Sequence, residues 1–360
     1  MKIAIVGPSH PYKGGIAQHT TRLAQHLSDA GNEVEIISWR IQYPFFYPGV
    51  QTVPNGKPEQ PLFITNRRVL SWKNPIGWIV WARYLRRFDR VIFVWWVPLI
   101  QGPIYSIMIK VMGINHPKIM LICHNITSHS GSPLDKLLTK LVFRSVDNLI
   151  VHTQTMADQA SNITSKSISM TKMPAHLPVA QILRTLEYEC KRSLLFFGLV
   201  RHYKGVDILV KALAKTRDVN LVIAGEMWGK QEKILKELIS MLGLGDRVKL
   251  IPKYVESDHI PKLFSDCDAL VMPYRSGTAS QNVEFAFAYG RPVIATKVGS
   301  APSQIVDGID GLLCEPDDVE SLSSAITHFY ESGIAKELAS GIKNIDTEDD
   351  WTKYITAITS

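Results

Sequence analysis

The sequence alternates short apolar runs with segments of helical periodicity, and this alternation starts twice. The first series occupies residues 2–150 and the second begins at residue 193. Apolar strands that alternate with helices of about 10 to 15 residues predict parallel sheets covered by helices on both faces. We therefore expect an α/β chain of two doubly wound, Rossmann-like domains. The runs read as strands include residues 3–6, 34–38, 90–94, 119–123, 149–152, 194–197, 221–224 and 248–251.

The length of the chain supports two domains. A chain of 360 residues is too long for one ordinary core, and domains of about 150 to 200 residues are typical. Residues 174–192, with two prolines and a charged run, are expected to connect them. Because ligands bind beyond the carboxyl ends of parallel strands, the two domains are expected to face each other across a cleft that holds the site.

Composition excludes several classes of protein. With 46% apolar and 20% charged residues the chain is globular rather than disordered or fibrous. Its four cysteines are widely spaced without a C-x-x-C pair, which argues against a zinc site or a disulfide framework and fits a reducing cytoplasm. The first apolar run is too short for a signal peptide. Residues 91–114 are broken by Pro98, Pro103 and Lys110, which favours a strand and a helix over a membrane span.

Positive charge is concentrated in the first half of the chain. Residues 1–188 carry 20 basic and 9 acidic residues, although the net charge of the whole chain is only +7. This asymmetry predicts that the first half faces something anionic. Basic residues interleaved with Trp72, Trp78 and Trp81 suit an anionic membrane surface, whereas an amphipathic helix with tryptophans in the core explains the pattern equally well. The basic residues are Arg67, Arg68, Lys73, Arg83, Arg86 and Arg87.

Residues 270–299 predict a phosphate site. They read as a strand end, a Gly/Ser/Thr loop at 275–280, a short helix at 282–288, a glycine at 290 and a further strand. Free N–H groups and the positive end of the helix dipole would meet at the loop, where an anion can bind. Glu284 in the first turn would repel a phosphate, so it either stabilises the helix start or reaches a neutral ribose diol.

Other strand ends carry further candidates. Arg201 and Lys204 lie on one loop and fit a pyrophosphate clamp, although a solvated loop is the simpler interpretation. His124 follows a strand at the edge where the cleft is expected, and a structural role is its alternative. Gly14 and Gly15 follow the first strand and let the backbone approach a ligand closely. The loop lacks the G-x-G-x-x-G spacing, which disfavours a dehydrogenase.

Taken together, these stretches resemble the retaining glycosyltransferases of family 4 (group 1), which have the GT-B fold. The resemblance runs through essentially the whole chain in order. The matching pieces are Gly14-Gly15, Cys123-His124-Asn125, Phe197-Gly198 with Arg201 and Lys204-Gly205, Ala224-Gly225-Glu226, Tyr274 through Gly299, Pro302 with Val306, Gly308 and Gly311, and Pro316-Asp317-Asp318.

The resemblance implies transfer of a hexosyl or N-acetylhexosaminyl group from a nucleotide-sugar to an acceptor hydroxyl, with retained configuration and without a metal or cofactor. Residues 1–180, together with a C-terminal helix at about 341–360, would bind the acceptor, and residues 190–340 would bind the donor. A UDP-sugar is favoured as the donor. The acceptor would be a lipid-linked saccharide, a glycolipid or a surface polysaccharide precursor. We expect a cytoplasmic protein, peripheral on the inner face of the plasma membrane, that binds no nucleic acid.

The resemblance also assigns roles to residues. Glu284 would bind the ribose hydroxyls, Lys204 with Arg201 would neutralise the diphosphate, and His124 would lie beside the donor sugar and the acceptor. The backbone of Lys253, Tyr254 and Val255 would meet the nucleobase. The remaining donor-side residues would be Gly14, Gly15, Gly225, Glu226, Ser276, Gly277, Thr278, Ala279 and Ser280, and those on the acceptor side His10, Tyr12 and Lys13.

Two positions depart from the family pattern. Ser276 stands where the family has a glutamate eight residues before Glu284, close to the donor sugar. The arginine that normally follows Gly198 directly comes later, at Arg201. A nucleotide-sugar epimerase of the same architecture and a catalytically lapsed nucleotide-sugar-binding protein therefore stay open as alternatives.

Overall fold

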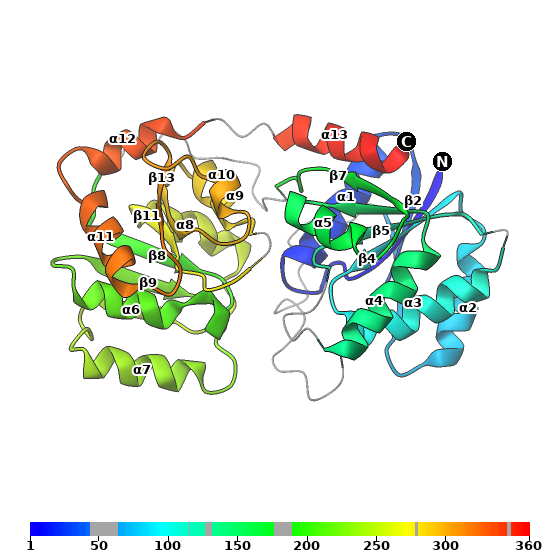
Figure 1. The fold of residues 1–360 in the computed structure, drawn as a ribbon, viewed down its shortest axis with the longest axis horizontal. Helices are drawn as coiled ribbons and strands as arrows, with labels where there is room; N and C mark the ends of the chain where they lie inside the picture. The colour runs from blue at the N-terminus through cyan, green and yellow to red at the C-terminus, as the bar shows by residue number, and fades with distance from the viewer. Residues whose placement is uncertain (44–63, 115, 127–131, 176–188, 278–279, 344–346) are drawn as a thin grey trace. The chain divides into compact units, whose positions relative to one another are not determined.

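The computed structural model describes residues 1–43, 64–114, 116–126, 132–175, 189–277, 280–343 and 347–360. The chain divides into two compact units, which Figure 1 shows with their elements labelled. Unit 1 consists of Met1–His176 together with Thr347–Ser360, and unit 2 consists of Leu177–Asp346. Each unit has its own parallel sheet and its own hydrophobic core.

The sheet of unit 1 has the strand order β3-β2-β1-β4-β5-β6-β7 among the described residues, and every pairing is parallel. Val6 lies between Ile37 on one side and Phe93 on the other. The strands are β1 (Lys2–Val6), β2 (Glu33–Ile41), β3 (Thr65–Ser71), β4 (Arg90–Trp95), β5 (Lys118–Cys123), β6 (Asn148–Val151) and β7 (Ser167–Met170). The helices are α1 (Gly15–Asp29), α2 (Pro75–Leu85), α3 (Pro98–Met112), α4 (Pro133–Ser145), α5 (Gln154–Ser161) and α13 (Thr347–Thr359).

Local sequence explains where these elements begin. All six residues of the central strand β4 are buried, as expected for a strand covered on both faces. Helices α2 and α4 begin with a proline, which fits the first turn because its missing N–H has no helical partner there. The preceding side chains of Asn74 and Ser132 accept hydrogen bonds from the N–H groups of Gly77 and Asp135 and so cap the two helices.

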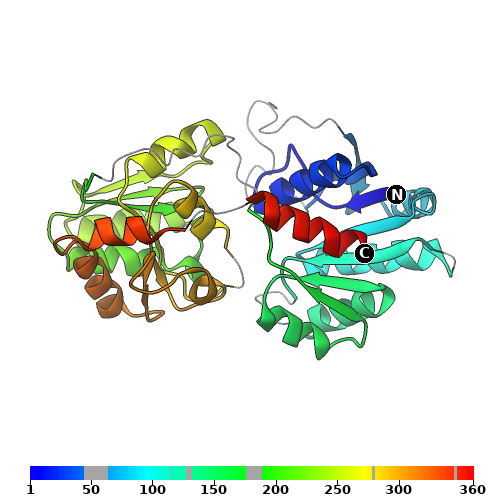
Figure 2. The same cartoon turned by 90° about the horizontal axis from the view of Figure 1, so that it is seen from above.

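The C-terminal helix α13 completes the core of unit 1. Trp351, Tyr354 and Ile358 are buried, and the indole N–H of Trp351 donates to the carbonyl of Ala175 at 3.1 Å. Figure 2 shows α13 alongside α1, with which it is in contact. The last residues of the chain therefore return to the unit in which the chain begins.

The sheet of unit 2 has the strand order β10-β9-β8-β11-β12-β13 among the described residues and is also parallel throughout. Its strands are β8 (Ser193–Phe197), β9 (Asn220–Ala224), β10 (Val248–Ile251), β11 (Ala269–Met272), β12 (Val293–Thr296) and β13 (Gly311–Cys314). Its helices are η2 (His202–Lys204), α6 (Val206–Ala214), α7 (Gln231–Met241), η3 (Ser257–His259), α8 (Ile260–Ser265), α9 (Asn282–Ala288), α10 (Ala301–Gln304), α11 (Val319–Phe329) and α12 (Ile334–Gly341).

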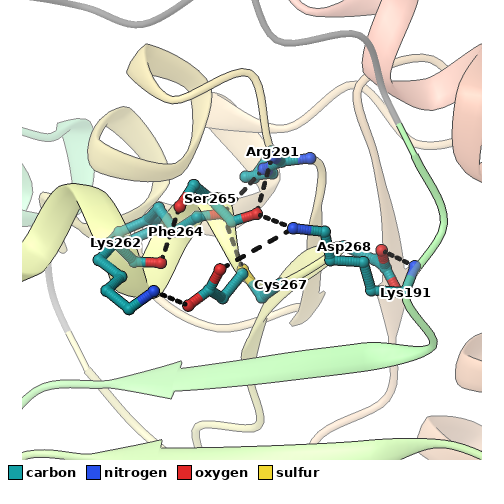
Figure 3. Close-up of polar contacts among 8 residues, drawn as sticks. Lys191, Lys262, Phe264, Ser265, Cys267, Asp268 and Arg291 are labelled. Carbon is teal, nitrogen blue, oxygen red and sulfur yellow. Dashed lines mark hydrogen bonds and ion pairs between the residues drawn. The ribbon is translucent and has the colours of Figure 1, made fainter.

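A polar network ties together the amino ends of β8, β11 and β12 (Figure 3). Asp268, just before β11, accepts hydrogen bonds from the backbone N–H groups of Lys191 and Ser193 at 2.7 and 2.8 Å. Arg291, just before β12, donates from Nε to the carbonyl of Phe264 at 2.8 Å. Because ligands of parallel sheets bind at the opposite, carboxyl edge, this network holds the sheet together away from the candidate site.

The basic stretch at 66–90 forms two elements rather than one. Residues 65–71 are the strand β3, and only residues 75–85 are helical. The single amphipathic helix considered for this stretch is therefore wrong, although Trp78 is buried as that interpretation required. None of the described helices has both the length and the apolar character needed to cross a bilayer.

Candidate active site

The loop that follows β8 is shaped by close backbone approaches. Gly205 has φ of 64°, and a Cβ there would lie 1.9 Å from the carbonyl oxygen of Pro273 at the end of β11. Gly225, at the end of β9, has φ of 149°, and a Cβ there would lie 2.1 Å from the carbonyl oxygen of Gly198. Only glycine fits these two positions. The carboxyl ends of β8, β9 and β11 are thereby drawn together.

Lys204 and the start of α9 meet at this edge. A Cβ built on Gly198 would lie 3.4 Å from Nζ of Lys204 and 3.7 Å from Nδ2 of Asn282. The Asn282 amide is fixed by donating to the carbonyl of Phe197 at 2.8 Å. The ammonium of Lys204 also lies over the ring of Tyr274, 5.4 Å from its centroid. Because the second N–H of Asn282 points to the hydroxyl of Tyr274, Lys204 is the group beside Gly198 that can attract an anion.

Hydrogen bonds of Ser280 hold the end of the loop that precedes α9. The Ser280 side chain accepts from the N–H of Asn282, while the N–H of Ser280 donates to Oγ of Ser300, both at 3.3 Å. Glu284 lies in the first turn of α9 and is buried. The helix has only seven residues, so its dipole is short and an anion would depend more on Lys204 and local N–H groups. Thr278 and Ala279, predicted to bind the donor, lie outside the described residues.

Arg201 stacks on an aromatic side chain of the same edge. Its guanidinium lies 4.0 Å from the ring centroid of Trp228, a cation–π contact. Trp228 follows β9 at the same edge of the sheet, next to the isolated pairing of Val200 with Met227. The structure therefore stacks Arg201 on an aromatic ring, while Lys204 is the cation beside Gly198.

The remaining predicted donor residues follow neighbouring strands. Gly225 and Glu226 follow β9, and Val200 donates its N–H to the carbonyl of Glu226 at 2.9 Å. Residues 253–255 follow β10, where Val255 is buried and the N–H of Lys253 donates to the carbonyl of Ile251 at 2.9 Å. Ser276 and Gly277 come directly after Arg275 in the β11–α9 loop; Ser276 is exposed and Gly277 is half-buried.

Arg275 organises this edge and was missed in the sequence. Its Nη1 and Nη2 both bind the Asp207 carboxylate at 2.8 Å, and Nη1 also donates to the carbonyl of His202 at 2.9 Å. Its backbone N–H donates to the carbonyl of Tyr203 at 2.7 Å. Burial alone would raise the pKa of Asp207, but the hydrogen bonds and charge of Arg275 lower it. The sequence offers one indication of this ion pair, which is the position of Arg275 at the start of the loop.

In unit 1, the loop after β1 is held against β2 and β3. Ser9 Oγ donates to Oγ of Ser38 at 3.0 Å, and Nδ2 of Asn66 donates to the carbonyl of His10 at 3.1 Å. Tyr12 is buried under the guanidinium of Arg68, and burial raises the pKa of its phenol. Lys13, Gly14 and Gly15 follow at the start of α1, where Gly14 has φ of 93°.

His124 belongs to a cluster of rings at the end of β5. Its ring lies 5.1 Å from that of His19 on α1 and 5.8 Å from that of His152, which follows β6. Tyr354 and Trp351 of α13 pack on the same group, with Tyr354 stacked on His152 at 5.8 Å. Burial lowers the pKa of His152 to about 4, despite the hydrogen bond of its Nδ1 to the carbonyl of Thr171. A C-terminal helix was expected on this unit, but the packing of α13 and His19 around His124 was not predicted.

The basic residues predicted to face a membrane divide into two groups. Arg67 pairs with Glu35 at 2.9 Å, and Arg68 and Arg87 lie over the rings of Tyr12 and Tyr84, although all three side chains are exposed. Lys73, Arg83 and Arg86 are exposed as well. Among the described residues, no group of three or more His, Cys, Asp or Glu side chains is placed to hold a metal ion.

Comparison with known proteins gives matches along most of the chain. The family model "Glycosyl transferases group 1" matches residues 182–346, and the model "Glycosyltransferase Family 4" matches residues 13–167. A D-inositol 3-phosphate glycosyltransferase from Arthrobacter is 33% identical over 147 residues, which is 39% of this chain and 35% of that protein. The chain thus aligns with only about a third of the length of this relative.

Solved structures are similar over the full length. Sucrose-phosphate synthase from Thermosynechococcus elongatus superposes with a TM-score of 0.72 at 16% identity, covering 100% of this chain and 97% of that one. HepE from Anabaena, solved in complex with UDP and also with UDP-glucose, gives a TM-score of 0.74 at 16% identity in its UDP complex, with both chains covered completely. At this identity the likeness concerns the fold, which was predicted correctly. The chain is a GT-B protein and belongs to the family 4, or group 1, glycosyltransferases.

Proposed function

We propose that this protein transfers a sugar from a nucleotide-sugar to an acceptor hydroxyl with retention of anomeric configuration. One observation carries the proposal. The ammonium of Lys204 lies beside Gly198 at the carboxyl end of β8, next to Asn282, which is two residues before Glu284 in α9. Departure of a nucleoside diphosphate builds negative charge on phosphate oxygens, and a preorganised cation and N–H donors stabilise that charge without a metal ion.

The donor is proposed to be a UDP-sugar bound by unit 2. The complexes of HepE with UDP and UDP-glucose support this choice. In the proposed arrangement Lys204 neutralises the diphosphate and Glu284 binds the ribose hydroxyls, while the backbone at 253–255 meets the base. The transferred group is hexosyl or N-acetylhexosaminyl.

Unit 1 is proposed to bind the acceptor, with His124 and residues 10–13 near the reacting hydroxyl and the backbone at Gly14 and Gly15 near the diphosphate. The sugar passes through an oxocarbenium-like state, so the protein contributes mainly position and charge. The acceptor is proposed to be a lipid-linked saccharide, a glycolipid or a surface polysaccharide precursor reached at a membrane surface. The excess of basic residues in the first half of the chain supports this choice.

The test has two steps. Nucleoside diphosphates and UDP-sugars are first screened by thermal shift, because a ligand that binds only the folded state raises the melting temperature. UDP-glucose, UDP-galactose and UDP-N-acetylglucosamine are then incubated with lipid-linked acceptors, and the anomeric configuration of the product is read by NMR. Release of UDP that depends on acceptor, with a retained product, is expected. Absence of both stabilisation and UDP release would refute the proposal.

A lapsed nucleotide-sugar-binding protein is the second candidate, and Ser276 in place of a glutamate favours it. This alternative would be supported if UDP stabilised the protein but no acceptor were glycosylated, either by the wild type or by the variant Ser276→Glu. An epimerase would instead interconvert UDP-sugars without any acceptor, which an incubation with the UDP-sugar alone would reveal.

A further inference from the structure

Helices α2, α3 and α4 pack side by side in unit 1, and Figure 1 shows them grouped on one side of the sheet. Each begins with proline followed by an exposed aliphatic residue. Ile76 is 75% exposed, Leu99 is 46% exposed and Leu134 is 54% exposed. Each helix follows a parallel strand, so all three first turns lie at the carboxyl edge of the sheet, the edge at which His124 follows β5.

The exposed aliphatic residues continue along each helix. Val80 is one turn beyond Ile76 on α2, and Ile107 is two turns beyond Leu99 on α3. On α4, Leu137 and Leu141 follow Leu134 at spacings that keep them on one face. Single exposed aliphatic residues are ordinary, but stripes on three adjacent helices form an apolar patch of the kind that marks an interaction site. We call this surface the helical face.

The helical face carries positive charge only. The sequences of α2, α3 and α4 contain a single acidic residue, Asp135, and it is fully buried. On α4 three exposed cations flank the leucines, and further exposed cations are Lys110 on α3 and Arg83 on α2. The three on α4 are Lys136, Lys140 and Arg144, and among the described residues none of them has an ion-pair partner.

We propose that the helical face docks on the surface of an anionic bilayer, with its aliphatic side chains among the acyl chains and its cations on the lipid phosphates. A second copy of the chain fits poorly, because a two-fold interface would set this cationic surface against itself. Nucleic acid would match the charge but would leave the aliphatic stripes without an apolar partner. A bilayer satisfies both requirements, and docking there brings the His124 edge close to a lipid-linked acceptor.

This inference deepens the proposed function, and its test is independent of sugar transfer. The full chain is sedimented with vesicles of phosphatidylcholine alone or mixed equally with phosphatidylglycerol, at low and high salt, without donor or acceptor. The charge variant is Lys136→Gln, Lys140→Gln and Arg144→Gln, and the apolar variant is Leu134→Gln, Leu137→Gln and Leu141→Gln. The control is Ile234→Gln with Met241→Gln on α7 of unit 2, where both side chains are also exposed.

We expect binding to the anionic vesicles that weakens at high salt. The charge variant should bind at least about tenfold more weakly, since each cation near an anionic surface contributes on the order of a fivefold factor. The apolar variant should also bind at least about tenfold more weakly, because binding strength scales with the apolar area buried in the bilayer. The control should bind like the wild type. Circular dichroism melts confirm that the variants are folded. The proposal is overturned if the wild type ignores anionic vesicles at low salt or if both triple variants bind undiminished. A dimer abolished by the apolar variant, with unchanged vesicle binding, would assign the face to a second copy instead.

Discussion

Arg275 and Asp207 form a two-armed ion pair across the carboxyl edge of unit 2, with both bonds at 2.8 Å. The same guanidinium holds the carbonyl of His202, and the Arg275 backbone holds that of Tyr203. Both carbonyls belong to η2, the short helix that ends in Lys204. The loop before α9 is thereby tied to the segment that carries the candidate diphosphate ligand.

Arg275→Ala should therefore weaken both stability and turnover. Losing charged hydrogen bonds from a largely buried guanidinium should cost about 1.5 to 3 kcal/mol of unfolding free energy, measured by urea denaturation. Transfer rates should fall with it, because η2 loses its anchor. Asp317→Asn is the matched control, since Asp317 binds the same arginine through an exposed carboxylate and should cost under about 1 kcal/mol. Equal effects of the two variants would contradict the anchoring role.

Lys204→Ala should reduce turnover far more than stability. If the ammonium neutralises the departing diphosphate, kcat/KM should fall by about 100- to 1,000-fold, whereas its contact with the Tyr274 ring should contribute only about 0.5 to 1 kcal/mol to folding. Steady-state rates and a thermal melt measure the two effects. Lys249→Ala, an exposed lysine on β10 of the same unit, serves as control. Near-normal turnover in Lys204→Ala would remove this residue from the site.

Glu284→Gln distinguishes the two roles that the sequence leaves open. If the carboxylate binds the ribose, affinity for UDP should fall by about 1.5 to 3 kcal/mol, the worth of hydrogen bonds to a charged group. 2′,3′-Dideoxy-UDP should then bind the variant and the wild type equally in calorimetry, because it lacks the hydroxyls concerned. If the residue only stabilises the start of α9, the melting temperature should fall while both nucleotides keep their affinities.

The sequence predicted the two sheets because buried parallel strands, such as β4 and β11, appear as continuous apolar runs. It did not predict β3, whose sequence TNRRVLS is polar because the strand lies at the edge of its sheet. The roles of Lys204 and of the loop before Glu284 are predictions drawn from local patterns at strand ends. The pairing of Arg275 with Asp207 joins the β11–α9 loop to the first turn of α6, 68 residues away, and such contacts leave no local pattern in the sequence.

The ring cluster around His152 should make folding sensitive to acid. Burial lowers the pKa of His152 to about 4, whereas an unfolded histidine titrates near about 6.5. At pH values between these two pKa values, His152 therefore binds a proton in the unfolded chain but not in the folded chain. Stability from the neutral ring is present above about pH 6.5 and is lost as the pH falls toward 4, by roughly 1 to 3 kcal/mol.

Urea denaturation between pH 7 and pH 4 measures this loss. His152→Asn should flatten the pH dependence of the unfolding free energy between these pH values. An identical slope in wild type and His152→Asn would show that this ring does not couple folding to pH.

Two glycines with nearly the same backbone conformation separate steric fit from backbone strain in unit 2. Gly205 and Gly229 have φ of 64° and 66°, but a Cβ on Gly205 would lie 1.9 Å from the Pro273 carbonyl oxygen, whereas a Cβ on Gly229 meets nothing within 4 Å. Gly229→Ala should cost only the left-handed strain, about 1 to 2 kcal/mol. Gly205→Ala should cost clearly more, because the end of β11 must also move away from the Lys204 loop. Denaturant melts measure both, and equal losses would mean that the loop after β8 yields without disturbing β11.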